Sequence, residues 1–190
     1  MAEILLFHHA QGQTAGFLVF ADDLRAAGNV VHAPDLYDGK TFAGLTEGVG
    51  YAKHVGFDVI LKRGTAAAEG LPPEIVYAGF SLGVLPAQKL AQTRPGARGA
   101  LLFSACFSTS EFGTPWPDGV PVQIHAMDAD EWFEEDMTAA RELVDETENA
   151  ELFLYPGDGH LFADSSLSDF DPQAAALLKE RVLAFLEAVG

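Results

Sequence analysis

The sequence predicts an α/β fold in which a mostly parallel sheet is covered by helices on both faces. Short apolar runs alternate along the chain with segments of helical periodicity. The runs are continuously apolar, as in strands buried on both faces, and they lack the polar alternation of a strand that faces water. The intervening segments are long enough for parallel crossovers, which need a dozen or more residues.

Six runs predict the strands of this sheet. They are rich in aliphatic and aromatic residues and are flanked by turn-forming residues, which is typical of β-structure. In chain order they cover residues 4–8, 30–33, 75–78, 100–103, 120–125 and 151–155. Active sites in open parallel sheets collect at the carboxyl ends of the strands. Polar residues just beyond these runs are therefore the candidates for chemistry.

Apolar residues at three- and four-residue steps predict the helices. They are expected around residues 17–24 and 49–60, over residues 82–92, from about residue 134, and over residues 172–189. Pro86 removes one backbone bond from the third helix, which should start tightly or bend there. The predicted apolar faces contain Phe17, Phe20, Ala21 and Leu24 in the first helix, Val49, Ala52, Gly56, Val59 and Ile60 in the second, Met137, Ala140, Leu143 and Val144 in the fourth, and Leu178, Val182, Phe185, Leu186 and Val189 in the last.

Length and composition predict one domain that spans residues 1–190. The chain is 48% apolar and 21% charged, which is the composition of a globular protein with a sizeable core. Its formal net charge of −17 opposes binding to nucleic acid or to an anionic membrane surface by Coulomb repulsion. We interpret the acidity as a solvated surface. We expect a small-molecule substrate and a monomer or a small homo-oligomer.

The single cysteine, Cys106, excludes an internal disulfide and leaves no cysteine cluster for a structural zinc. A chain that cannot form an internal disulfide suits a reducing compartment. The apolar run at residues 4–7 is too short for a membrane span and lacks the basic start of a signal peptide. The expected location is therefore cytoplasmic.

The segment Gly79-Phe80-Ser81-Leu82-Gly83 lies between the third predicted strand and the third predicted helix. It resembles the nucleophile elbow of α/β-hydrolases, a sharp strand-to-helix turn that exposes a serine. Glycine is needed two residues either side of the serine because larger side chains would collide in this turn. The following helix points its free N–H groups at the place where an oxyanion would form. The alternative is that Ser81 only fills a tight turn.

Two later strand ends offer partners for Ser81. Asp128 and Asp130 follow the fifth predicted strand, and His160 lies in a glycine-rich loop after the sixth. Nucleophile, acid and histidine then follow the chain order of α/β-hydrolases. A histidine in such a loop can accept the hydroxyl proton and return it to the leaving group. Either aspartate could instead be a solvated loop carboxylate, and His160 could be a loop histidine bonded to its own backbone.

The other histidines fit the role of the base less well. His54 falls in a helical pattern and His125 in a strand, where packing or surface roles are expected. His32 lies in an early strand, far from the place that the chain order assigns to the base. His8 and His9 end the first strand, where they could be ordinary strand-end polarity or part of a pocket.

Four segments together resemble the dienelactone hydrolase family over nearly the whole chain. They are the elbow, Pro34-Asp35-Leu36-Tyr37, the turn from His125 to Trp132, and Gly159-His160-Leu161-Phe162. The resemblance implies that Asp130 is the triad acid, in preference to Asp128, and that His160 is the histidine. The family's nucleophile is often cysteine, whereas this sequence has Ser81. A serine favours an esterase over a thiol enzyme and leaves Cys106 as a buried, inert residue.

Two further positions depart from the resemblance and concern the substrate. The family glutamate that contacts the resting nucleophile falls on His9, and the arginine that holds a substrate carboxylate falls on Asp164. An aspartate there would repel that carboxylate. The sequence therefore argues against a dienelactone as the substrate.

The end of the first strand is where hydrolases of this fold place the second oxyanion donor. The backbone N–H groups of Ala10 and Leu82 are the candidates for the oxyanion hole. Among the aromatic residues near loops, which are more often packing residues, some could form the wall of an apolar pocket. The pocket candidates are His9, Tyr37, Phe112, Trp116 and Trp132.

These observations predict a serine hydrolase that cleaves a small ester or lactone by acylation and deacylation of Ser81, with no metal or organic cofactor. The short loop at residues 108–121 suggests a fairly open pocket. One alternative is a non-catalytic relative that keeps the fold as a ligand-binding or regulatory module. Another is a metal-dependent hydrolase built on His8, His9, His125 and Asp128, although no tight metal-ligand spacing is present.

Overall fold

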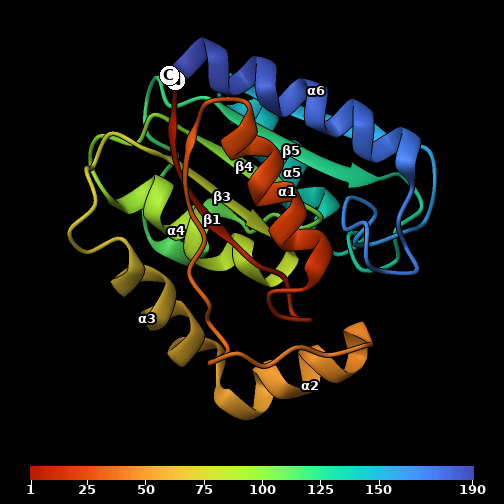
Figure 1. The fold of residues 1–190 in the computed structure, drawn as a ribbon. Coiled ribbons are helices and arrows are strands. Elements are labelled where there is room, and N and C mark those ends of the chain that lie inside the picture. Colours follow the sequence, from red (N-terminus) through yellow and green to blue (C-terminus); the bar gives the residue numbers. More distant parts are fainter.

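The computed structural model describes residues 1–190 and contains one six-stranded sheet in which every neighbouring pair is parallel. The strand order is β2-β1-β3-β4-β5-β6. Figure 1 labels β1, β3, β4 and β5 of this sheet. This arrangement confirms the predicted mostly parallel sheet. The strands are β1 Glu3–Phe7, β2 Val30–His32, β3 Val76–Phe80, β4 Gly99–Phe103, β5 Val122–Met127 and β6 Ala150–Tyr155.

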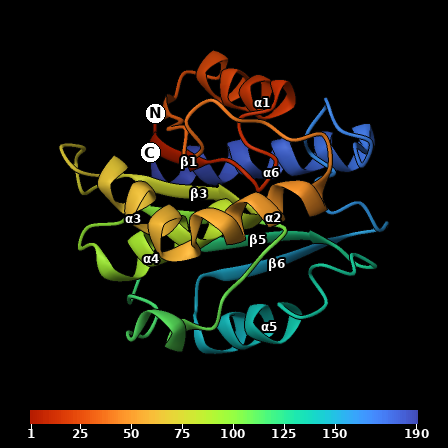
Figure 2. The ribbon, with the colours of Figure 1, turned by 90° about the horizontal axis from the view of Figure 1, so that it is seen from below.

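Helices cover both faces of the sheet, as the sequence predicts. In Figures 1 and 2, α1 and α6 lie together on one face, whereas α3, α4 and α5 lie on the other. The helices are α1 Ala15–Ala26, α2 Leu45–Val55, α3 Phe57–Ala67, α4 Val84–Thr93, α5 Met137–Glu146 and α6 Pro172–Val189, with short 3-10 turns at Ser81–Gly83 and Thr109–Phe112. None of them combines the length and the apolar character that a bilayer crossing requires.

The core is divided by the sheet into two clusters of buried residues. Successive strand residues point to opposite faces, so Ile4 and Leu6 pack towards α1 and α6 while Leu5 and Phe7 pack towards α3 and α4. The central strands β3 and β4 are buried along their whole length. The edge strand β6 differs, because only Tyr155 of its six residues is fully buried. Burial on both faces therefore holds for the central strands and is wrong for the edge strands β6 and β2, since Val30 of β2 is 45% exposed.

The predicted second helix is two helices. Gly56 has a φ of +97°, a left-handed conformation in which glycine is favoured, and it ends α2 and begins α3. The apolar periodicity continues across the break, which is why the sequence alone suggested a continuous helix. The break turns α3 towards α4, where Gly64 packs against the ring of Pro86.

The third helix begins as a tight turn, as Pro86 suggested. A 3-10 turn over Ser81–Gly83 precedes α4, and Pro86 lies in the first turn of α4, where the N–H that it lacks has no helical partner to lose. The fourth helix starts at Met137, later than the predicted start near residue 134. The last helix has the predicted bounds, and Asp171 caps its first turn by accepting from the N–H groups of Gln173 and Ala174.

Candidate active site

Ser81 lies at the carboxyl end of the central strand β3, in a strained turn. Its φ of 47° is in the left-handed region, which residues other than glycine seldom adopt. A Cβ on Gly79 would collide with the carbonyl oxygen of Gly83, and one on Gly83 would collide with the carbonyl oxygen of Phe7. Both flanking glycines are thus required by close backbone approach. The turn has the shape that the glycine spacing predicts.

Ser81, His160 and Asp130 form one chain of hydrogen bonds. Nε2 of His160 lies 2.8 Å from Oγ of Ser81, and Nδ1 of His160 lies 2.7 Å from Oδ2 of Asp130. A carboxylate only accepts, so Nδ1 carries the proton that is donated to Asp130. Nε2 is then free to accept the proton of the Ser81 hydroxyl. The three side chains come from the ends of β3, β5 and β6.

The acidic partner in this geometry is Asp130 and not Asp128. Asp130 is buried, and its second oxygen accepts a hydrogen bond from the N–H of Trp132 over 2.9 Å. Asp128 is exposed and accepts from the N–H of Gly157 over 3.0 Å. The carboxylate of Asp128 thus links the loop after β5 to the loop after β6, and does not contact His160.

The main chain at His160 is held by Ser104, which follows β4. The hydroxyl of Ser104 donates to the carbonyl oxygen of His160 over 2.6 Å. Ser104 also has a left-handed φ, of 58°. Sequence reasoning missed this residue, although it is a polar residue directly after a strand and could have been found by the same rule that selected the other strand ends.

The two candidate oxyanion donors lie beside Ser81. Ala10 and Leu82 line the same cavity as the serine, and the N–H of Ala10 donates to no backbone carbonyl. The loop that carries Ala10 is anchored by Gln11, whose carbonyl accepts from the N–H of Phe42 over 2.9 Å. On its other side, a Cβ on Gly48 of α2 would collide with the carbonyl oxygen of Ala10. This backbone is therefore held firmly in place.

A cavity of about 460 Å³ opens onto Ser81 and His160. Most of its wall is apolar, and two aromatic side chains at its rim, Phe57 and Trp132, are 44% and 49% exposed. Two carboxylates, Glu135 and Asp136, also line it. Of these two aromatic residues and two carboxylates, the sequence analysis named only Trp132 as a pocket candidate. The remaining lining residues are Ala10, Val49, Ala52, Leu82, Leu85, Ser104, Ala105 and Phe107.

Asp136 is half-buried beside the cavity. Burial raises the pKa of its carboxyl above the usual range, although a hydrogen bond from the N–H of Cys106 opposes the shift. Cys106 itself is buried, and burial together with Asp136 raises the pKa of its thiol to about 12. A thiol with such a pKa stays protonated near neutral pH and is a poor nucleophile.

Three residues predicted to contact substrate, together with Phe112, lie outside this cavity. Tyr37 is fully buried, packs edge-on against Tyr51, and has a pKa raised by burial. Trp116 is buried and donates from Nε1 to the carbonyl oxygen of Val120 over 2.7 Å. Phe112 packs edge-on against Phe107. These aromatic residues serve as packing, which corrects the predicted role of Tyr37 and Trp116.

His9 is the third residue predicted to contact substrate, and its side chain points into the interior of the protein. Nε2 of His9 lies 2.9 Å from Oδ2 of Asp164, and both side chains are buried. The two positions that depart from the resemblance therefore contact each other. Neither residue lines the cavity at Ser81. The argument that Asp164 would face and repel a substrate carboxylate is consequently wrong.

The other buried histidines are engaged in local hydrogen bonds. Burial lowers the pKa of His8 to about 4 and that of His125 to about 3, so both are neutral at pH 7. His8 accepts from the N–H of Leu36 over 2.9 Å, and His125 lies 2.8 Å from the hydroxyl of Tyr155. The chain contains no group of three or more His, Cys, Asp or Glu side chains arranged to hold a metal ion.

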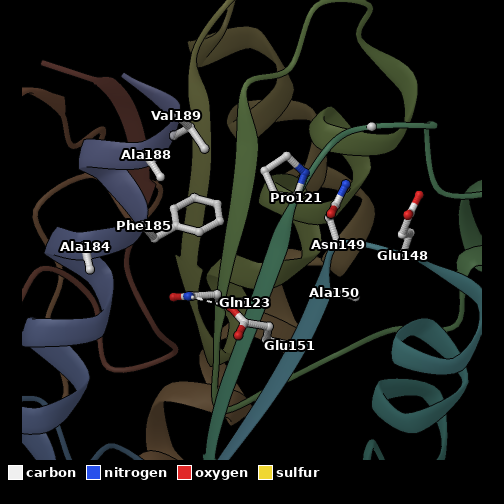
Figure 3. A pocket seen from close by; sticks show the side chains of 11 residues that line it. Pro121, Gln123, Glu148, Asn149, Ala150, Glu151, Ala184, Phe185, Ala188 and Val189 are labelled. Atoms are coloured by element: carbon white, nitrogen blue, oxygen red, sulfur yellow. Dashed lines mark hydrogen bonds between the residues drawn. The ribbon is translucent and has the colours of Figure 1, made fainter.

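A larger hollow, of about 650 Å³, lies at the opposite end of the sheet (Figure 3). It is bordered by the start of β5 and β6 and by the last turns of α6, and the ring of Phe185 projects towards the strands. Its polar side chains are amides and carboxylates, among them Gln123 and Glu151, which are hydrogen-bonded to each other over 3.0 Å. No serine, cysteine or histidine lines this hollow, so the smaller cavity is the candidate active site.

The sheet topology and the strand-end site define an α/β-hydrolase. The chain belongs to the dienelactone hydrolase family, whose sequence profile matches residues 2–190. It is therefore a hydrolase by family membership. No curated protein matches the sequence significantly.

Solved structures of similar fold cover the whole chain. A dienelactone hydrolase-like promiscuous phosphotriesterase from metagenomic libraries shares 16% identity, with a TM-score of 0.76 over 100% of this chain and 87% of its own. Dienelactone hydrolase from Anabaena variabilis shares 16% identity, with a TM-score of 0.74 over 100% and 87%. Esterase 2 of Thermogutta terrifontis, phosphonylated by cyclosarin, shares 20% identity, with a TM-score of 0.69 over 100% and 83%. At these identities the likeness shows the fold.

Proposed function

We propose that this protein is a serine hydrolase that cleaves small carboxylic esters or lactones through an acyl-enzyme on Ser81. The observation that carries the proposal is the continuous hydrogen-bonded chain from Ser81 through His160 to Asp130, inside a cavity at the carboxyl ends of the strands. This arrangement has the order and the spacing that nucleophilic catalysis by serine requires. The family membership of the chain supports hydrolysis as the reaction class.

In the first half of the reaction, Oγ of Ser81 attacks the ester carbonyl carbon while Nε2 of His160 takes the hydroxyl proton. The carbonyl oxygen becomes an oxyanion, which the N–H groups of Ala10 and Leu82 would stabilise. The imidazolium then gives its proton to the departing alkoxide, and the acyl group stays on Ser81. Asp130 stabilises the imidazolium and holds its tautomer.

In the second half, water replaces the alcohol. His160 takes a proton from the water as the water oxygen attacks the acyl carbon. The bond between the acyl carbon and Oγ of Ser81 then breaks, and His160 returns the proton to Oγ. The products are a carboxylic acid and free enzyme. Every step uses only side chains and N–H groups of this chain, the ester and water.

The substrate class is inferred from the wall of the cavity. A volume of about 460 Å³ with a mainly apolar lining suits a small acyl or alcohol group. The carboxylates of Glu135 and Asp136 face the same space, and the whole chain carries a net charge of −17. Both features disfavour anionic esters. We therefore propose that neutral esters and lactones are the substrates, and that a negatively charged dienelactone is a poor one.

The test combines labelling with substitution of the nucleophile. Purified protein is treated with a fluorophosphonate, and the modified peptide is identified by mass spectrometry. Phosphonylation of Ser81 and complete loss of short aryl-ester hydrolysis in Ser81→Ala, with an unchanged circular dichroism spectrum, are expected. Near-normal turnover by Ser81→Ala would refute the proposal.

The same experiment separates the proposal from its rivals. A folded wild-type protein that neither reacts with the fluorophosphonate nor hydrolyses any ester would favour a non-catalytic ligand-binding role. Turnover that is lost with a chelator but retained in Ser81→Ala would favour a metal-dependent reaction.

A further inference from the structure

His9 and Asp164 form a buried pair for which the proposed chemistry has no use. Nε2 of His9 lies 2.9 Å from Oδ2 of Asp164, and the two side chains are only 1% and 3% exposed. The residues are 155 positions apart in the sequence. Their contact therefore joins two distant loops, one after β1 and one after β6.

The hydrogen bonds around the pair specify which atoms donate. The N–H of Gln11 donates to Nδ1 of His9 over 3.2 Å, so Nδ1 is unprotonated and Nε2–H donates to the carboxylate. Asp164 also accepts from the hydroxyl of Thr14 and, over 2.9 Å and 2.6 Å, from the N–H and hydroxyl of Ser166. Burial alone would raise the pKa of Asp164, but these hydrogen bonds outweigh it and lower the pKa to about 2. The carboxylate is thus ionised and tightly held.

Each partner is next to a group that the reaction needs. Ala10, a candidate oxyanion donor, directly follows His9 in the chain. Asp164 lies in the same loop as His160, and its own N–H donates to the carbonyl oxygen of Leu161 over 3.0 Å, which closes the intervening residues into a turn. The pair is therefore connected through few residues to both the Ala10 N–H and the His160 side chain.

Two further hydrogen bonds also join these loops, because the hydroxyl of Thr14 donates to Asp164 and the N–H of Gly16 donates to Oγ of Ser166 over 2.9 Å. The remaining anchors tie each loop to other parts of the fold. Nε2 of Gln11 donates to the carbonyl oxygens of Phe42 and Ala43 over 3.1 Å each, which ties the Ala10 loop to the segment before α2. Ser104 ties His160 to the end of β4. Among the bonds that join the two loops, the one from His9 to Asp164 begins at the residue directly before Ala10.

We propose that His9 and Asp164 are positioning residues, whose hydrogen bond sets the distance between the Ala10 N–H and the His160 imidazole. This inference rests on the proposed function. An oxyanion donor must sit about 2.7–3.1 Å from the developing charge, while the base stays within reach of Ser81. Misplacement of such groups by about 1 Å can cost roughly a hundredfold in rate. The pair therefore acts on the chemical step through the two loops, without touching the substrate.

The experiment compares three variants with a matched control. His9→Leu removes the donor, and His9→Gln keeps an amide that can donate to Asp164 and accept from Gln11. The double variant with His9→Leu and Asp164→Leu removes the buried carboxylate together with its histidine partner. In the control, His32→Leu breaks a histidine–carboxylate pair of similar length, in which His32 Nε2 lies 2.8 Å from Glu3 Oε1 at the edge of the sheet. The values of kcat and KM for a short aryl ester and the thermal unfolding midpoint are measured for each, beside wild type and Ser81→Ala.

For His9→Leu we expect kcat to fall by roughly tenfold to a hundredfold, with KM little changed and the assay run well below the unfolding midpoint. His9→Gln should recover most of the loss, and His32→Leu should keep wild-type kcat. In the double variant kcat should stay low whatever the change in the unfolding midpoint, because the link from His9 to Asp164 is still missing.

Two results would overturn the inference while leaving the proposed function intact. One is wild-type kcat in folded His9→Leu when Ser81→Ala is inactive. The other is recovery of kcat together with stability in the double variant, which would assign the pair a purely structural role. Retained turnover in Ser81→Ala would instead refute the proposed function, and the positioning role with it.

Discussion

The hydroxyl of Ser104 donates to the main-chain carbonyl of His160 over 2.6 Å, so the residue after β4 holds the histidine that follows β6. A hydrogen bond of this kind contributes about 1 kcal/mol to stability. Ser104→Gly keeps the left-handed φ of 58° accessible but removes the bond. We expect a loss of about 1 kcal/mol in urea unfolding and a lower kcat. The exposed Ser110→Gly is the control, and equal kcat for both variants would contradict the prediction.

Asp130 and Asp128 provide a second test, because they are chemically identical and two residues apart. Asp130→Asn should leave the fold intact but favour the wrong tautomer of His160, and in serine proteases the same change lowers kcat by about 10⁴-fold. Asp128→Asn should leave kcat near wild type, because its carboxylate contacts only the N–H of Gly157. Steady-state kinetics of both variants with one aryl ester make the comparison. A larger loss in Asp128→Asn would reverse the assignment of the acid.

The carboxylate of Glu135 should set a preference for uncharged substrates. Glu135→Gln is expected to raise kcat/KM for an anionic ester relative to its neutral isostere by roughly threefold, the size of one screened charge at about 6 Å in water. The neighbouring Glu134→Gln is the matched control, since Glu134 is also exposed but does not line the cavity. A ratio that is unchanged in Glu135→Gln, or that shifts equally in both variants, would contradict the prediction.

Two glycines on α2 differ sharply in what a side chain would meet. Gly48→Ala would drive a Cβ into the carbonyl oxygen of Ala10, whereas Gly50→Ala meets nothing within 4 Å. Gly48→Ala should therefore destabilise the protein and displace the Ala10 backbone. Gly50→Ala should stabilise it by about 0.5–1 kcal/mol. Thermal unfolding and aryl-ester turnover report both effects, and equal behaviour of the two variants would rule out the close approach of α2.

Stability should fall as the pH drops below about 6.5, where an unfolded histidine begins to bind a proton. In the folded state, burial, aided by Arg181, lowers the pKa of His125 to about 3. Between these values the unfolded chain binds more protons than the folded one, so the free energy of unfolding decreases as the pH decreases. His8, with a pKa lowered to about 4, adds to this slope down to that pH.

His125→Gln removes one of these titrations. The free energy of urea unfolding, measured at a series of pH values, should therefore depend less steeply on pH below 6.5 than in wild type. His54→Gln, at an exposed position on α2, should leave the slope unchanged. An identical slope in His125→Gln and wild type would show that His125 does not contribute.

Much of the architecture could be predicted from local patterns. A buried strand is an apolar run, and a helix repeats its apolar residues every three to four positions, so the central strands and α6 were evident. The exposure of the edge strand β6 and the break at Gly56 were not evident, because exposure depends on neighbours in the sheet and the apolar repeat continues across the break. The elbow could be recognised because its steric requirements fall within five consecutive residues.

The sequence by itself determined the α/β class, the strained turn at Ser81, and the chain order of serine, acid and histidine. Only the tertiary structure decided that Asp130 rather than Asp128 reaches His160, that Phe57 and Glu135 border the cavity, and that His9 turns inward to Asp164. The physical reason is the separation along the chain between the residues that interact. Backbone strain and periodicity are set by residues adjacent in the chain, whereas a side chain's partner is set by the packing of loops that are distant in sequence.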